Sequence, residues 1–172
     1  MNLTTPLTRF QRILLGTDGT VTHILEAYAD EPIEVVKLFQ AFDVSVDGDA
    51  ALLLSEGERV LRRRVLLRGT RSNRNLLYAE VVVVLGRVDR GILDGLVATD
   101  KPIGILLREN RAETFREILG IEREPAGSCA SHFGIDPDAE IIGRTYRIVA
   151  RRQPVILVTE KFPSGFFRDL PA

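Results

Sequence analysis

Hydrophobic residues recur at every second position, or in short runs, along several stretches of the chain, and both patterns are typical of β-strands. Valine, isoleucine and other residues that favour strands are frequent in these stretches, and polar residues, glycine or proline separate them. We therefore expect strands at residues 33–46, 58–68, 76–85, 141–150 and 154–162.

The N-terminal part of the chain instead has hydrophobic residues spaced three or four apart, as on one face of a helix. This spacing predicts a helix over residues 3–15 that ends near Gly16. It predicts a second helix through residues 23–28, for which Thr20 or Thr22 is a suitable N-cap.

The middle of the chain has mixed patterns. Residues 90–97 and 99–107 predict two short helices, the second beginning near Pro102, because proline is tolerated in the first turn of a helix. Residues 113–121 fit a helix or a strand equally well by periodicity alone. Proline, glycine, serine and aspartate in residues 122–138 predict a loop.

Short polar segments at residues 69–75 and 151–153 connect consecutive predicted strands, so each pair is expected to form a hairpin. A further turn is expected at residues 46–50, which contain an Asp-Gly pair. Hairpins with segregated helices predict an α+β fold, namely a single, mainly antiparallel sheet of about six strands with helices packed around it. A length of 172 residues favours one domain over residues 1–172.

The composition excludes several function classes. A formal net charge of −1 gives no general attraction to nucleic acids or anionic membranes, and the hydrophobic runs are too short to span a bilayer. The N-terminus does not resemble a secretory signal, and the single cysteine, Cys129, cannot form an intrachain disulfide. Cys129, His23 and His132 are too few and too far apart for a zinc site, and none belongs to a catalytic motif. We expect a cytoplasmic protein with no metal.

Glu160 is the most unusual residue of the last predicted strand. Strand alternation places it on one face with Ile156, Val158 and Phe162. Burying an isolated carboxylate is costly, so Glu160 should pair with a cation or face a cleft.

Arg63 has the same peculiarity on another strand. It shares a face with Leu61 and Val65, whereas Arg62 and Arg64 fall on the opposite, solvated face. An arginine on a hydrophobic face should meet a carboxylate, supplied by the protein or by a ligand.

Three further charged residues are candidates for the same region. Glu80 lies among hydrophobic neighbours, which fits an ion pair with an arginine of the sheet as well as a role in a site. Arg144 and Arg147 lie on opposite faces of the strand expected beside Glu160, and either is a candidate partner for its carboxylate. These residues together predict a pocket for a small anion, lined by at least one arginine and one carboxylate.

The same stretches resemble chorismate lyase (chorismate–pyruvate lyase), especially its archaeal and actinobacterial branch. The matching segments, in the expected order over nearly the whole chain, are TRFQRILL at 8–15, TDGTVT at 17–22, LRRRVLL at 61–67, DKPIGILL at 100–107, GRTYRI at 143–148 and TEKFP at 159–163. The ligand-sensing (UTRA) domains of GntR-type transcription regulators share this fold and are weaker relatives.

The resemblance implies an enzyme without a cofactor that converts chorismate to 4-hydroxybenzoate and pyruvate. It implies that Arg63 and Glu160 are active-site residues, and that the backbone at Ile103, with Pro102 and Gly104 beside it, contacts the ligand. On this basis Arg63 binds one carboxylate of the substrate. Glu160 either binds the ring hydroxyl or relays a proton.

The sequence leaves three points open. The second substrate carboxylate is assigned to Arg144 or Arg147, with no observation that decides between them. The alternatives to chorismate cleavage are a ligand-sensing module without catalysis and a related lyase that makes another hydroxybenzoate. The segment before residue 33 is short and not basic, which disfavours a DNA-binding helix-turn-helix. The oligomeric state does not follow from the sequence.

Overall fold

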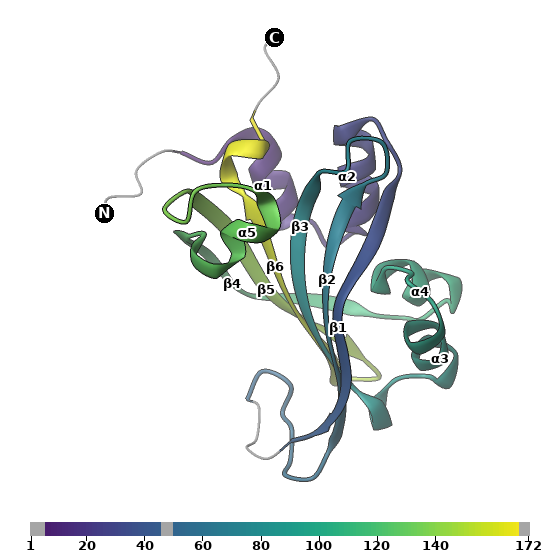
Figure 1. The fold of residues 1–172 in the computed structure, drawn as a ribbon. Coiled ribbons are helices and arrows are strands. Elements are labelled where there is room, and N and C mark those ends of the chain that lie inside the picture. Colours follow the sequence, from purple (N-terminus) through teal and green to yellow (C-terminus); the bar gives the residue numbers. More distant parts are fainter. Residues whose placement is uncertain (1–5, 46–49, 169–172) are drawn as a thin grey trace.

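The fold was analysed in a computed structural model that describes residues 6–45 and 50–168. Its centre is a six-stranded sheet in the order β1-β2-β3-β6-β5-β4, in which every neighbouring pair is antiparallel (Figure 1). The strands are β1 (Ile33–Val44), β2 (Arg59–Gly69), β3 (Asn75–Val84), β4 (Phe115–Pro125), β5 (Glu140–Ala150) and β6 (Gln153–Pro163).

Five α-helices and three short 3₁₀ turns are present in the described part of the chain. The helices are α1 (Arg9–Gly16), α2 (Val21–Ala29), α3 (Arg90–Ala98), α4 (Ile103–Glu109) and α5 (Ala130–Phe133). The turns are η1 (Leu85–Arg87), η2 (Gly127–Cys129) and η3 (Ser164–Phe166). The predicted α+β class and antiparallel sheet are confirmed.

The first helix begins later than its hydrophobic spacing predicts. Thr8 is the N-cap of α1, because its hydroxyl accepts a hydrogen bond from the Gln11 amide at 3.1 Å. The Gln11 side chain in turn accepts one from the Thr8 amide at 2.9 Å, which completes a capping box. The helix therefore starts at Arg9; residues 3–5 of the prediction lie outside the described residues.

Residues 113–121, whose periodicity fits a helix and a strand equally well, lie mainly in a strand, β4. β4 pairs with β5 along its whole length and forms one edge of the sheet, which exposes many of its side chains and weakens its periodicity. The loop predicted at residues 122–138 is wrong in part, because β4 continues to Pro125 and η2 and α5 follow it. The turn predicted at residues 46–50 falls mainly on 46–49, outside the described residues.

The sheet is assembled from the two predicted hairpins. β2–β3 and β5–β6 are each antiparallel pairs of consecutive strands, and they join through pairing of β3 with β6. β1 and β4 then add at the two edges. The four central strands carry most of the buried residues, so the core and the candidate charged residues lie in the same part of the molecule.

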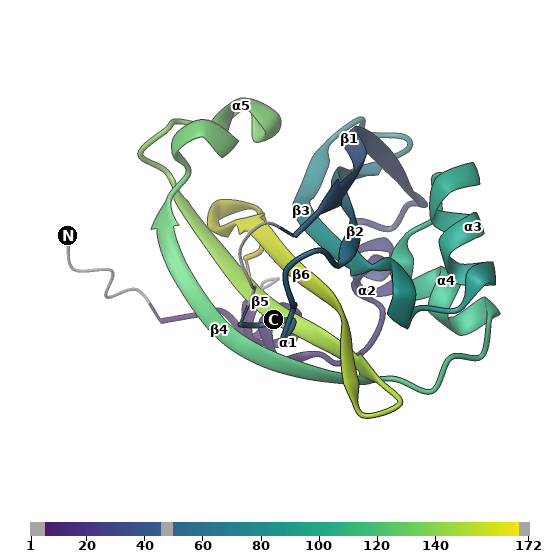
Figure 2. The same ribbon diagram turned by 90° about the horizontal axis from the view of Figure 1, so that it is seen from below.

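Helices α1 to α4 cover one face of the sheet as two separate groups. α1 and α2 contribute Leu14, Leu15 and Leu25 to a hydrophobic cluster at one end, whereas α3 and α4 contribute Leu96 and Leu106 to a second cluster at the other end. α5 packs on the opposite face, and Figure 2 shows it across the sheet from α1 and α2. This arrangement leaves a space between the two helix groups.

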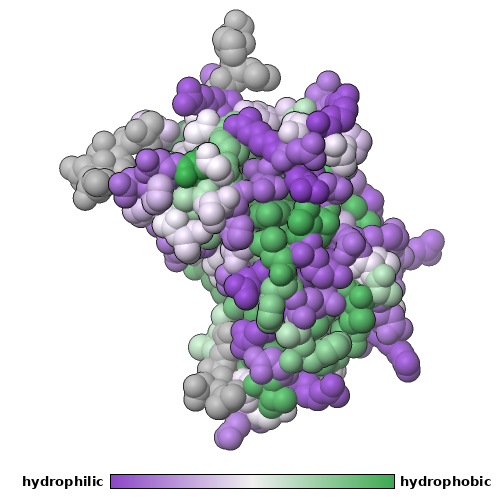
Figure 3. Space-filling view, in the orientation of Figure 1, coloured by the Kyte–Doolittle hydropathy of each residue, from purple (hydrophilic) through white to green (hydrophobic). Residues whose placement is uncertain are grey.

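The opposite face of the sheet is only partly covered. α5 packs over Leu66 and Tyr78 near one end, and Leu52 and Leu54 pack over Val60 near the other. Figure 3 views the molecule from this side and shows hydrophobic side chains exposed between polar ones in the middle. The fully enclosed part of the sheet is therefore on the side of α1 to α4.

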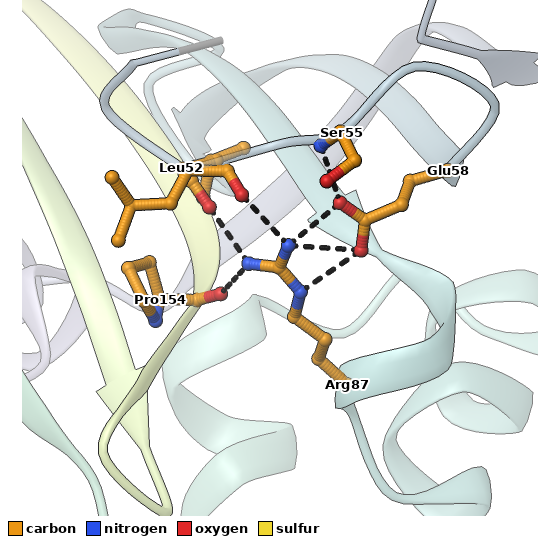
Figure 4. A network of polar contacts seen from close by, with 6 residues as sticks. Leu52, Ser55, Glu58, Arg87 and Pro154 are labelled. Carbon is orange, nitrogen blue, oxygen red and sulfur yellow. Dashed lines mark hydrogen bonds and ion pairs between the residues drawn. The ribbon is translucent and has the colours of Figure 1, made fainter. Parts of the chain in front are cut away.

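Arg87 is the centre of a network of hydrogen bonds between segments that are far apart in the sequence (Figure 4). Its Nη1 donates to the carbonyl oxygens of Leu52 at 2.7 Å and Pro154 at 2.8 Å. Its Nη2 lies 2.7 Å from Oε2 of Glu58, which also accepts a hydrogen bond from the Ser55 amide. The hydrogen bond from the Ser55 amide lowers the pKa of Glu58, and the hydrogen bond and charge of Arg87 lower it further. One side chain thus joins the segment before β2 to the β5–β6 hairpin.

We expect Arg87→Ala to lower the free energy of unfolding by about 2–3 kcal/mol, because it leaves several acceptors without their charged donor. Urea unfolding measures this loss. The control is Arg90→Ala, whose side chain is 92% exposed and should change stability by less than ~0.5 kcal/mol. Equal losses in the two variants would contradict a structural role for the Arg87 network.

Candidate active site

A pocket lies between the two helix groups on the covered face of the sheet. Together with the open space at its mouth it amounts to about 610 Å³. Valine, leucine and alanine side chains of the strands form a large part of its lining, and residues at the beginning of α2 and α4 form its walls. Its charged and phenolic side chains are Arg63, Arg116, Tyr146 and Glu160.

Arg63 lies in the middle of β2 and is 3% exposed, as its position on a hydrophobic face predicts. Its Nη1 donates to the carbonyl oxygen of Lys101 at 3.3 Å. Its Nε and Nη2 are buried and have no hydrogen-bond partner among the described residues. Two donors of one guanidinium are thus available on the pocket side.

The environment of Arg63 disfavours its charge in the absence of an anion. Burial lowers the pKa of the Arg63 guanidinium, and the charge of Asp100 opposes this effect only in part. Asp100 is itself mostly exposed and forms an ion pair with Lys37 at 3.0 Å. An arginine stays protonated at neutral pH even so, and a bound anion would relieve the cost of burying it.

Glu160 has two protein donors, one for each carboxylate oxygen. Arg144 lies directly opposite it on β5, and its Nε donates to Oε2 at 2.7 Å. The hydroxyl of Tyr146 donates to Oε1 at 3.0 Å. Both side chains of the ion pair are at most 5% exposed, so Glu160 is the paired, buried carboxylate that the strand pattern predicts.

Arg144 also fixes the link between α1 and α2. Its Nη1 donates to the Thr17 carbonyl at 2.6 Å and lies 3.5 Å from the Leu15 carbonyl. Its guanidinium carbon lies 5.0 Å from the centre of the Tyr146 ring, and its Nη2 is buried without a partner among the described residues. Of the two candidate partners for Glu160, Arg144 is the correct one.

Tyr146 is a hydrogen-bond donor in this group. Burial raises the pKa of its phenol, and the negative charge of Glu160 raises it further, whereas Arg144 and Arg116 act in the opposite direction. The hydroxyl therefore keeps its proton at any ordinary pH. It can orient the Glu160 carboxylate but cannot serve as a base.

The beginning of α4 forms the wall that faces these residues. Pro102 is the N-cap, and Ile103 and Gly104 line the pocket, so the backbone predicted to contact a ligand is in place. The first amides of a helix have no partner within it. A side chain at Gly104 would lie 3.1 Å from Cγ2 of Thr20, so glycine permits the close approach of α4 to the start of α2.

Two parts of the pocket were missed by sequence reasoning. The start of α2, from Gly19 to Thr22, forms a wall, although the sequence indicated it only as a turn and a helix cap. Arg116 of β4 reaches the pocket from the edge of the sheet. Its face could not be assigned while residues 113–121 remained ambiguous, so the one useful indication was an arginine in a segment with several hydrophobic residues.

Two other candidate residues lie on the opposite face of the sheet. Arg147 pairs with Glu117 at 2.8 Å and donates to the Ala51 carbonyl, so the prediction that it could be the partner of Glu160 is wrong. It neighbours Leu157 instead, because a shift of three residues along β5 reverses the face. Glu80 is exposed and accepts a hydrogen bond from the Tyr78 hydroxyl at 2.6 Å. Neither residue lines the pocket.

The histidines and the cysteine also lie elsewhere. His23 is on the surface beside Glu26, and the ring of His132 stacks on that of Tyr78. Cys129 is buried at the end of η2, next to α5, and burial raises the pKa of its thiol, which disfavours the reactive thiolate. Among residues 6–45 and 50–168, no three His, Cys, Asp or Glu side chains gather as metal ligands would. In the same ranges, no helix is long and hydrophobic enough to cross a membrane.

Comparison with known families shows to which family the chain belongs. The family model described as "Chorismate pyruvate-lyase Rv2949c-like" matches residues 15–168 of the chain. The chain belongs to this family. The resemblance found in the short sequence segments is thereby confirmed, and the protein is an enzyme of the lyase class.

Curated relatives carry the same description. The chorismate pyruvate-lyase of Mycobacterium leprae is 34% identical over 168 residues, covering 96% of this chain and 79% of the relative. That of Mycobacterium tuberculosis strain H37Rv is 30% identical over 174 residues, covering 96% of this chain and 85% of the relative.

Solved structures with the same fold include effector domains of transcription regulators. The effector domain of PhnF from Mycobacterium smegmatis superposes with a TM-score of 0.68 at 12% identity, covering 92% of this chain and 98% of that one. The C-terminal domain of the histidine utilization repressor from Pseudomonas syringae gives a TM-score of 0.61 at 15% identity, covering 81% and 97%. At such low identity these similarities concern the fold alone.

Proposed function

We propose that this member of the family is a chorismate pyruvate-lyase that eliminates pyruvate from chorismate and leaves 4-hydroxybenzoate. Family membership and the composition of the pocket support the proposal. The observation that carries it is Arg63, whose Nε and Nη2 are buried and have no partner among the described residues. A planar carboxylate matches two neighbouring guanidinium donors and would satisfy both.

The reaction requires few functional groups from the protein. Chorismate carries one carboxylate on its ring and one on its enolpyruvyl ether. Cleavage of the ether C–O bond releases enolpyruvate, and loss of the proton from the hydroxyl-bearing ring carbon makes the ring aromatic. The hydrophobic strands and the walls from α2 and α4 hold the ring away from water, so binding geometry contributes a large part of the acceleration.

In this proposal Glu160 acts on the hydroxyl-bearing side of the ring. A carboxylate offers about four acceptor positions, and Arg144 and Tyr146 use two of them. The remaining positions can accept the ring hydroxyl or the proton released from the ring carbon. Because the two donors fix both oxygens, Glu160 would need no rearrangement before reacting.

A ligand-sensing module is the second candidate function. It is favoured by the fold shared with the effector domain of PhnF and the C-terminal domain of a histidine utilization repressor. A pocket with an arginine and hydrophobic walls would suit that role as well. The buried Glu160 with two fixed donors is the feature that favours catalysis, because a negative charge on the protein would not help the pocket to bind an anionic ligand.

Incubation of the purified chain with chorismate separates these functions. We expect stoichiometric pyruvate and 4-hydroxybenzoate, released equally fast with and without a metal chelator, which tests the predicted independence from cofactors. Tight binding without turnover would instead support the sensor, and a different hydroxybenzoate would identify a related lyase.

Removal of the Arg63 guanidinium should weaken product binding. We expect Arg63→Gln to reduce 4-hydroxybenzoate affinity by about 10-fold to 100-fold, the effect of losing one or two charge-assisted hydrogen bonds. The control, Arg62→Gln, removes an exposed arginine that pairs with Asp43 on the other face of the same strand. Calorimetry that finds equal affinities in the two variants would remove Arg63 from the binding site.

A cytoplasmic location and the absence of a nucleic-acid partner remain predictions. They rest on the single buried cysteine and the near-neutral net charge.

A further inference from the structure

Arg116 is, beside Arg63, a second guanidinium in the lining of the pocket. It extends from β4, and its Nη1 donates to the carbonyl oxygen of Asp18 in the link between α1 and α2. Its Nε is buried and has no partner among the described residues. Like Arg63, it therefore presents an unsatisfied buried donor in a lining that is mostly hydrophobic.

The two arginines lie at different positions around the start of α4. Arg63 donates to the carbonyl of Lys101, just before the helix. The Nη2 of Arg116 lies 3.6 Å from the point where a Cβ of Gly104 would stand. Arg116 is also near enough to Tyr146 for its charge to act against the rise in the pKa of that phenol. The pocket thus has two separate cationic positions.

The charges of the pocket are not balanced by the protein. Glu160 is the only carboxylate in its described lining, and that carboxylate is already neutralised by Arg144 at 2.7 Å. Arg63 and Arg116 therefore add two positive charges to the lining, and Asp100, which lies outside the lining, offsets that of Arg63 only in part. A ligand with two carboxylates would match both charge and position.

We propose that Arg116 binds the second carboxylate of the ligand and makes the pocket selective for dicarboxylates over monocarboxylates. This inference rests on the proposed function and deepens it. Arg144, which the sequence offered for this role, is engaged by Glu160 and by backbone carbonyls and does not line the pocket. Arg116 does line the pocket, and its Nε has no partner among the described residues.

Selectivity for two carboxylates has a consequence for turnover. Chorismate would contact Arg63 and Arg116 at once, so the second contact forms without a further loss of translational freedom. Cleavage of the ether places the two carboxylates on separate molecules, 4-hydroxybenzoate and pyruvate. Each product then contacts only one of the two arginines, so it binds to the pocket more weakly than the substrate does.

The test compares a dicarboxylate and a monocarboxylate in the same variants. Binding of chorismate is measured by calorimetry in the Glu160→Gln background, and binding of 4-hydroxybenzoate in the otherwise unaltered protein. We expect Arg116→Gln to weaken chorismate by about 10-fold to 100-fold and 4-hydroxybenzoate by less than about 3-fold. Arg116→Lys, which keeps the charge and loses the planar fork, should fall between.

The control is Arg123→Gln, an arginine of the same strand that pairs with Glu140 and does not line the pocket. It should leave both affinities unchanged, and urea unfolding shows whether each variant is folded. Equal weakening of both ligands by Arg116→Gln, or unchanged chorismate binding, overturns the inference. So does a Glu160→Gln protein that binds chorismate no more tightly than it binds 4-hydroxybenzoate. If the pocket binds chorismate selectively but the unaltered protein does not cleave it, the lyase proposal fails and the inference stands.

Discussion

Glu160→Gln should reduce the rate of pyruvate release by at least ~100-fold, the usual contribution of a positioned proton-transfer group. The amide has the shape of the carboxylate, and its oxygen can still accept a hydrogen bond from Arg144, so the fold should be kept. It cannot take up a proton from the ring carbon. Steady-state release of pyruvate from chorismate measures the effect.

The matched control for this change is Glu80→Gln. Glu80 lies on β3, the strand beside Glu160, but on the opposite and exposed face. Its replacement should leave turnover unchanged. A fall of less than about 10-fold in Glu160→Gln, with an unchanged KM, would show that Glu160 holds the ring hydroxyl and does not transfer a proton.

Arg144→Leu should lower the free energy of unfolding by about 3–5 kcal/mol, the cost of breaking a buried ion pair from one side. The variant leaves the 4% exposed Glu160 with Tyr146 as its remaining donor. It also removes the donor to the Thr17 carbonyl, which ties the link between α1 and α2 to the sheet. Urea unfolding at neutral pH measures the loss.

Arg147→Leu is the matched control, three residues along the same strand. Its ion pair with Glu117 is partly exposed and should contribute only ~1 kcal/mol or less. The double variant Arg144→Leu, Glu160→Leu separates charge from packing, because it removes both members of the buried pair. If the double variant is no more stable than Arg144→Leu alone, the loss comes from packing, and the ion-pair explanation is wrong.

Much of the sheet could be predicted from local sequence. Alternation placed Arg63 on a buried face and Arg62 on an exposed one, and the structure confirms both. The period of a strand is two, so a residue's face follows from its neighbours once the strand itself is recognised. The same rule identified Glu160 as buried before any partner was known.

Residues on the edge of the sheet were beyond this reasoning. β4 pairs on one side only, and several of its hydrophobic side chains are exposed, including Phe115 at 64% and Ile121 at 53%. Because both faces of such a strand are partly exposed, hydrophobic and polar residues need not alternate along it. Its sequence therefore fits a helix equally well. Arg116 could not be assigned to the pocket for this reason.

The choice of cation for Glu160 also depended on tertiary structure. Arg144 and Arg147 are close in sequence and carry the same group. Only the register of β5 against β6 places Arg144 opposite Glu160 and Arg147 opposite Leu157. Register is fixed by the β5–β6 turn and by side-chain packing, neither of which can be read from one strand alone.

The sequence by itself determined that a buried arginine and a buried carboxylate share the hydrophobic faces of an antiparallel sheet, since strand periodicity and the cost of burying charge are local properties. The tertiary structure alone decided which groups meet. It brought the start of α2, the start of α4 and the edge strand β4 around Arg63 and Glu160. Contacts between such distant segments depend on how the helices pack against the sheet, and no periodic pattern in the chain records that packing.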